Sequence, residues 1–293
     1  MHLFLNAIGF DGISTTAKEN KLLKGIIRDA LESNTIKYHA ESGTGVIMAN
    51  FGDKENFGIC IKGHYNGTDK FKMEYYFPYL VSDCISNIEE LNIERHADKD
   101  SYAIVCDEVK AGVTLIFYLQ NIFDYYNFKA KSDSICGRTI AISGLAGSGR
   151  ILLPLIKDDQ QIKQIKRDAL VRNQLINAAR QGDEEAIENL TIDDLDTYSQ
   201  ISRRVHKEDV YSIVDTTFMP YGVECDQYAV IGEILDFTYC TNTYTGEKVC
   251  VMVLDCNDVI IRTAINADNL LGEPQVGRRF KGSMWISAHV NFD

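Results

Sequence analysis

The sequence predicts an α+β protein with three successive parts. These are an N-terminal mixed α/β domain over residues 1–157, a helical connector over residues 158–220 and a small antiparallel β-barrel, OB-like or SH3-like, over residues 221–293. Three observations support this order: short strand-like runs fill the first part, helical spacing of apolar residues dominates the second, and closely spaced strand-like runs return in the third. A length of 293 residues exceeds one average domain and favours more than one unit.

The first part combines one amphipathic helix with short strands. Apolar residues at helical spacing predict a helix over residues 18–33. Runs bounded by Gly and Asn predict strands over residues 45–52, 57–65 and 71–80. The Asn-Gly pair within residues 65–69 is typical of a hairpin turn. The apolar run at residues 112–121 is compatible with a strand or with a buried helix, and both readings stay open.

The connector is predicted to contain several helices. Ile162, Ile165, Ala169, Ile176 and Ala179 mark one helical face, with an interruption expected at Arg172 and an end at Gly182. Asp183 is expected to cap a second helix. The segment "TIDD" at residues 191–194 matches a loose capping box and predicts the start of a third helix through residues 195–205.

The last part returns to strands. Four β-rich runs occupy residues 227–242, 247–257, 259–266 and 283–292. Tight turns separate them, and this even spacing of short strands predicts a small barrel.

A glycine-rich stretch, "SGLAGSGRI" at residues 143–151, has the G-x-x-x-x-G spacing of a phosphate-binding loop. Arg150 stands where that loop needs Lys, Ile151 where it needs a hydroxyl, and Pro154 would interrupt the helix that must follow. We therefore predict a turn between two strands and no nucleotide site at this stretch.

Charge and cysteine content narrow the classes of function. The net charge of −12 disfavours a nucleic-acid partner, although a local basic patch is compatible with it. The eight cysteines form no C-x-x-C pair, so we expect reduced thiols, no metal and no cofactor. The N-terminus lacks the features of a signal peptide, and the longest apolar run is too short to span a bilayer. We expect a soluble, cytoplasmic protein with no membrane partner.

Two clusters are candidate sites. Glu94, His96 and Asp98 in "IERHADKDSY" have the chemistry of general acid–base catalysis, but an ordinary charged loop has the same composition and is favoured. Cys106 would be a nucleophile only beside a base such as His64 or His96, and a buried structural thiol is favoured.

The second cluster lies in "GRRFKGSMW". Arg278, Arg279, Lys281 and Trp285 are candidates for binding an anionic ligand or stacking a base, whereas neutralisation of nearby acidic residues is the favoured alternative. Aromatic residues also gather at residues 75–80 and 123–128, either in a pocket or interface or, by default, in the core.

Longer motifs resemble a known family. "MEYYFPYL", "ERHADKDSYAIVCDE", "LIFYLQN", "NQLINAARQGDEEAIENLTIDDLDTYSQISRR", "EDVYSIVDTTFMPYGVECDQYAVIGEI" and "LLGEPQVGRRFKGSMW" are together similar to a domain-of-unknown-function family of anaerobic Gram-positive bacteria. The resemblance covers nearly the whole chain. It implies a bacterial, cytoplasmic protein and supplies no activity, cofactor or catalytic residue.

Together these observations favour a non-enzymatic binding or assembly protein whose partner is another protein or a second copy of the chain. The alternative is an enzyme or small-ligand sensor with an inter-domain site that uses the acidic and histidine residues or the arginines. A nucleic-acid-binding barrel is a third hypothesis.

Overall fold

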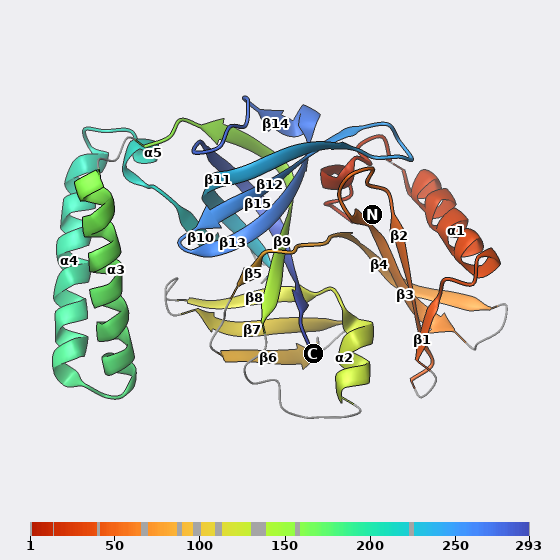
Figure 1. Cartoon of the computed structure of the whole chain (residues 1–293), viewed down its shortest axis with the longest axis horizontal. Coiled ribbons are helices and arrows are strands. Elements are labelled where there is room, and N and C mark those ends of the chain that lie inside the picture. The colour runs from red at the N-terminus through yellow and green to blue at the C-terminus, as the bar shows by residue number, and fades with distance from the viewer. Residues whose placement is uncertain are drawn as a thin grey trace.

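The computed structural model describes residues 2–13, 15–39, 42–65, 70–86, 90–95, 101–108, 113–129, 139–155, 159–222 and 226–292. Figure 1 shows a central barrel with a smaller sheet and helix α1 on one side and a pair of long helices on the other.

The helices are α1 (Thr16–Glu32), α2 (Ile122–Lys129), α3 (Asp159–Arg180), α4 (Glu184–Val205) and α5 (Val210–Ile213), with short 3-10 turns η1 (Asn6–Ile8) and η2 (Ala267–Asn269). The strands of the first half are β1 (Lys37–His39), β2 (Thr44–Asn50), β3 (Phe57–Tyr65), β4 (Phe71–Leu80), β5 (Ile85–Ser86), β6 (Glu90–Arg95), β7 (Tyr102–Glu108), β8 (Val113–Leu119) and β9 (Ile140–Leu152). Those of the second half are β10 (Thr217–Pro220), β11 (Gln227–Thr241), β12 (Lys248–Cys256), β13 (Val259–Asn266), β14 (Leu270–Leu271) and β15 (Arg279–Val290).

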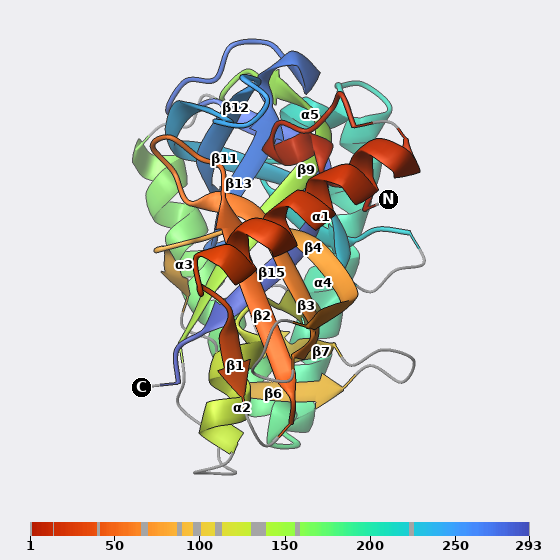
Figure 2. The ribbon, with the colours of Figure 1, turned by 90° about the vertical axis from the view of Figure 1, so that its right-hand side faces the viewer.

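The N-terminal elements follow the sequence prediction. The predicted helix is α1, which begins after Thr15, whose hydroxyl accepts a hydrogen bond from the Lys18 main-chain N–H. Strands β1 to β4 form an antiparallel sheet in chain order, and α1 lies across it (Figure 2). The open choice at residues 112–121 is resolved as strand β8, while the Asn-Gly turn lies outside the described residues.

The barrel closes in the order β11, β12, β13, β9, β15 and back to β11. The predicted β-barrel is thus confirmed, but the prediction that it is antiparallel is wrong at one place, because β13 and β9 pair in parallel. Parallel neighbours require a long crossover connection, and here more than a hundred residues of chain separate the two strands. The likeness to OB or SH3-like barrels stays a prediction.

Strand β9 belongs to the segment predicted as the N-terminal domain, yet it supplies one wall of the barrel. The domain limits at residues 157 and 220 therefore stay a prediction. Beside the barrel, β8 pairs in parallel with the end of β15 and continues the sheet through β7 and β6.

The prediction of a turn at the glycine-rich stretch, residues 143–151, is also wrong. This stretch is not a turn but the middle of the thirteen-residue strand β9. A Cβ at Gly144 would stand 2.4 Å from the Met284 sulfur, and one at Gly149 would stand 2.3 Å from the Phe280 ring. The glycines are therefore needed because large side chains of β15 lie directly over the strand. Gly147 is the extra residue at a bulge opposite β15.

The connector contains fewer breaks than predicted. Helix α3 runs through Arg172 without interruption, and α4 runs through residues 191–194, so the predicted third helix is a continuation of the second. The Thr191 hydroxyl donates to the carbonyl of Ile187 at 2.8 Å within α4, so it does not cap a new helix.

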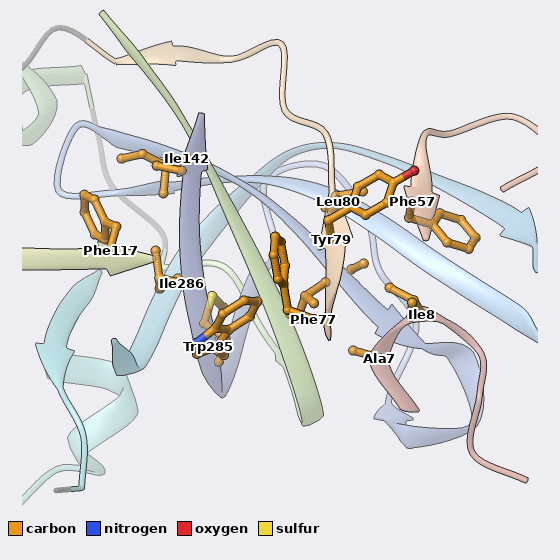
Figure 3. Packing of buried hydrophobic residues seen from close by; sticks show 14 of the residues in the cluster. Ala7, Ile8, Phe57, Phe77, Tyr79, Leu80, Phe117, Ile142, Trp285 and Ile286 are labelled. Atoms are coloured by element: carbon orange, nitrogen blue, oxygen red, sulfur yellow. The ribbon is translucent and has the colours of Figure 1, made fainter. Parts of the chain in front are cut away.

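One hydrophobic cluster joins the four-stranded sheet, the barrel and the β6–β8 extension. Figure 3 shows Phe77 of β4 beside Trp285 of β15, with Phe57 and Ile8 on one side and Phe117 on the other. The small sheet and the barrel are thus held together by burial of a shared apolar surface.

Candidate functional site

The two long helices form an antiparallel hairpin with a tight connection. Gly182 adopts a φ of 90°, the left-handed conformation that ends α3. The Asp183 carboxylate then accepts hydrogen bonds from the main-chain N–H groups of Glu185 and Ala186 at 3.0 and 3.2 Å, as predicted for the cap of α4. In Figure 1 the hairpin stands beside the barrel and reaches it at one end only.

That end is held by Arg279, one of the predicted ligand-binding residues. Its side chain is 4% exposed on β15. The guanidinium donates to the Leu153 carbonyl at 3.1 and 2.9 Å, just before the connector. It also donates to three carbonyls just after the hairpin, at 2.8, 2.6 and 3.3 Å, belonging to Tyr211, Val214 and Asp215.

These bonds make Arg279 a clamp on the strand that leaves the barrel and on the segment that returns to it. Burial lowers the pKa of the guanidinium, which the Asp215 carboxylate partly opposes, and an arginine remains charged under these conditions. Hydrogen bonds from a charged donor are among the stronger ones in proteins. The base of the hairpin is therefore fixed to the barrel.

The other three residues that the sequence predicted to bind a ligand are Arg278, Lys281 and Trp285, and each has a different hydrogen-bond partner. Lys281 donates to the Tyr211 hydroxyl and so supports the same clamp. The Trp285 indole N–H donates to Asp226 at 2.6 Å from within the core. Arg278 is the more exposed of the two arginines and donates to the Glu273 carbonyl at 2.9 Å.

The acidic and histidine cluster is only partly visible. Glu94 lies on β6 with an exposed side chain, and its main chain pairs with Ala103 of β7. His96 and Asp98 lie outside the described residues. Cys106 is buried and its thiol faces the Leu115 carbonyl at 3.6 Å, consistent with the structural thiol that was favoured.

Both aromatic segments pack inside the fold. Tyr75 and Phe77 come from residues 75–80, and Tyr126 comes from residues 123–128. The buried Lys62 ammonium lies 5.4 Å from the Tyr75 ring and 5.8 Å from the Tyr126 ring, so it bridges the four-stranded sheet to α2.

An exposed apolar stripe runs along α4, and we call it the α4 stripe. It consists of Ile187, Leu195, Tyr198, Ile201 and Val205. Their spacings of 8, 3, 3 and 4 residues place them on one side of the helix. Leu195 and Tyr198 are 61% and 73% exposed, whereas most large apolar residues of the body are buried.

Charge is distributed unevenly along the same helix. Residues 184–196 carry six carboxylates: Glu184, Glu185, Glu188, Asp193, Asp194 and Asp196. Its end carries Arg203 and Arg204, followed by Lys207. Although Arg204 pairs with Glu208 at 2.8 Å, the C-terminal end keeps a net positive charge. This arrangement also matches the helix dipole.

A hollow that sequence reasoning missed lies where α2 meets the end of β15. It has a volume of about 380 Å³ and is lined mainly by Asn, Asp, His and Phe side chains. Asn121 ties the two elements together, because its amide donates to the Val290 carbonyl at 2.8 Å and accepts from the Val290 N–H at 3.1 Å. Partial burial lowers the pKa of His289; Asp124 opposes this and Lys37 adds to it.

Across the described part of the chain, no group of three His, Cys, Asp or Glu side chains is placed to hold a metal ion. None of the helices within these ranges is long and apolar enough to cross a bilayer. The six cysteines that the structure describes are all free thiols.

Comparison with known proteins agrees with the motifs quoted above. The model of the family described as "Domain of unknown function, E. rectale Gene description (DUF3881)" matches residues 5–288. Neither the curated proteins nor the solved structures contain a match to the chain. Since the family match spans almost every residue, the chain belongs to the DUF3881 family.

Proposed function

We propose that the protein is an assembly protein that associates with a second copy of itself through the helical hairpin. The α4 stripes of two copies pack antiparallel, so that two hairpins complete a four-helix bundle. The observation that carries this proposal is the α4 stripe itself, a row of exposed large apolar residues on a projecting element.

The apolar surface supports a partner of some kind. The α4 stripe stays exposed although α3 lies beside α4, and four-helix bundles bury such faces by packing two pairs of helices around one core. Leu170 and Val171 of α3 are also exposed, at 64% and 55%, so the second helix carries uncovered apolar residues as well. A row of exposed large apolar residues such as the α4 stripe typically marks an interface.

The charges favour a second copy as that partner. In a twofold-symmetric pair, the acidic first half of one α4 lies beside the basic end of the other. Opposite charges meet at both ends, and like charges would meet in a parallel pair. The surface is therefore complementary to itself in one orientation only.

The clamp at Arg279 supports the same role. Because its guanidinium binds the segments on both sides of the connector, the hairpin projects from the barrel in a defined direction. A surface that is already ordered loses less conformational entropy on association.

Light scattering on a size-exclusion column tests this proposal. We expect wild-type protein to be a dimer and the Leu195→Glu variant to be a monomer, because two carboxylates would be buried at each twofold interface. The dissociation constant should rise by at least about a hundredfold. Leu271→Glu is the matched control, since Leu271 is 64% exposed on the barrel and lies outside the stripe.

Cysteine cross-linking tests the orientation. Ile187 and Val205 lie at opposite ends of the α4 stripe, and Leu195 lies near its middle. Antiparallel packing predicts oxidative cross-linking of Leu195→Cys alone and of the Ile187→Cys/Val205→Cys pair, but not of Ile187→Cys alone. A monomeric wild-type protein, or equal dissociation by Leu195→Glu and Leu271→Glu, would refute the assembly proposal.

A cytoplasmic location is part of the same proposal. The six described cysteines are free, and burial raises the pKa of Cys60 and Cys250 to about 12. Free thiols in this number suit a reducing compartment.

A further inference from the structure

A groove lies between α1 and the aromatic residues Phe51 and Tyr244. Its volume is about 630 Å³, within the usual range for sites that bind small molecules. Residues from α1 form one wall, and Phe51 and Tyr244 form the other. The groove therefore joins a helix near the N-terminus to the turn between β11 and β12.

The helix wall is positively charged. Lys21 and Lys24 are three residues apart, so their ammonium groups lie on the same side of α1. Within the described part of the chain, neither lysine is paired with a carboxylate. Arg28 also lines the groove, but Asp29 at 3.0 Å and Glu32 at 3.9 Å compensate its charge. Two uncompensated cations in one groove stand out in a chain of net charge −12.

The opposite wall presents aromatic rings. The centroids of Phe51 and Tyr244 are 5.8 Å apart, and Phe10 packs behind both at 5.2 and 6.0 Å. Tyr244 is 59% exposed even though its ring belongs to this cluster. A ring that is supported from behind and open in front is suited to stacking with a planar ligand.

Gly25 lines the same groove and has no structural explanation. It lies in the middle of α1 with a helical backbone, where glycine is unfavourable relative to alanine. Apart from its chain neighbours and the backbone of α1 itself, no atom lies within 4 Å of the position that its Cβ would occupy, so packing does not exclude a side chain. Its effect is to open a notch where a ligand can approach the helix backbone.

We propose that this groove binds a small aromatic anion of the nucleoside monophosphate type. The phosphate lies between Lys21 and Lys24, the planar ring stacks on the exposed Tyr244 ring with its edge toward Phe51, and the ligand passes over Gly25. A longer nucleic acid is disfavoured, because its further phosphates would meet a predominantly acidic surface.

Isothermal titration with AMP tests the proposal on the full-length protein, with adenosine, inorganic phosphate and a short oligothymidylate titrated for comparison. We expect saturable binding of AMP that is stronger than binding of either adenosine or phosphate. The Lys21→Ala/Lys24→Ala variant should bind AMP at least about tenfold more weakly, because two charged donors are lost. Lys70→Ala/Lys72→Ala is the matched control: both lysines are exposed on or beside β4, and the change in net charge is the same.

Gly25→Ala separates a binding role from a structural one. We expect it to weaken AMP binding while raising the thermal midpoint, since it fills the notch and improves the helix. Absence of AMP binding to wild type, or equal weakening by the two double-lysine variants, would overturn the proposal. Oligothymidylate binding that exceeds AMP binding would overturn it in favour of a single-stranded nucleic-acid site.

Discussion

Replacement of Arg279 is the sharpest test of how the helical hairpin is attached. Arg279→Met keeps the length and apolar stem of the side chain and removes the guanidinium. In the wild type, this group makes five hydrogen bonds to four main-chain carbonyls, from Leu153 on one side of the connector and from residues 211–215 on the other. The substitution therefore removes the hydrogen bonds that hold the segments on both sides of the helical hairpin.

The magnitude follows from those four acceptors. A hydrogen bond to a charged group contributes about 1.5–3 kcal/mol to stability. Leu153 is 72% exposed and residues 211–215 are mostly half-buried, so water can replace the guanidinium at part of the site. If two of the four carbonyls are left without a replacement, the free energy of unfolding falls by about 3 kcal/mol. Methionine leaves no buried charge behind, so no further penalty is added.

Urea denaturation and limited proteolysis together measure this effect. We expect a lower denaturation midpoint and faster cleavage near Leu153 and near residues 211–215. Arg278→Met is the matched control, since its neighbouring guanidinium makes one surface hydrogen bond, to the Glu273 carbonyl. A loss for Arg279→Met no larger than that for Arg278→Met, with unchanged cleavage, would show that the clamp does not hold the hairpin.

Other substitutions test the remaining features. Gly149→Ala should lower the free energy of unfolding by about 1–3 kcal/mol, because the new methyl group clashes with Phe280. Gly147→Ala should be nearly neutral, because the nearest atom to its new methyl group is 3.8 Å away. Equal losses of stability in thermal melting would contradict the argument that β15 approaches Gly149 closely. Burial lowers the pKa of His289 below its ordinary value of 6.5, so the unfolded state binds the proton at a higher pH than the folded state does. The free energy of unfolding of the wild type should therefore fall as the pH drops through 6.5 and below. In denaturation series at different pH, His289→Gln should show a weaker dependence of this free energy on pH. Cys84 is half-buried, whereas the other five described cysteines are buried, so it should be alkylated first among the six although burial and Asp83 raise its pKa. Peptide mapping after brief alkylation measures this order, and labelling of Cys60 before Cys84 would contradict it.

Much of the fold was predictable because the signals are local. The helical spacing over residues 18–33 corresponds to α1, and Asp183 caps α4 through hydrogen bonds that reach only three residues along the chain. The strand runs at residues 45–52, 57–65 and 71–80 became β2, β3 and β4. Where local signals were ambiguous, as at residues 191–194, a polar segment inside a long exposed helix resembled a new helix start.

The candidate site was only half predictable. The apolar residues of the α4 stripe are present in the sequence at helical spacing, but spacing does not reveal which helical faces remain uncovered. Arg279 was singled out as an anion-binding residue because it is basic and lies near aromatic residues. Its actual partners are main-chain carbonyls as many as 126 residues away, which no local pattern encodes.

The sequence by itself determined helix α1, strands β2 to β4, the helical character of the connector and membership of the family, since each depends on residue order over short distances or on motifs read directly. Only the tertiary structure decided that the glycine-rich stretch is a barrel strand. Gly144 and Gly149 are required because Met284 and Phe280 pack over them from a strand more than a hundred residues later. The same holds for the groove beside α1 and for the exposure of the α4 stripe, because burial is set by how distant segments pack and not by the residues themselves.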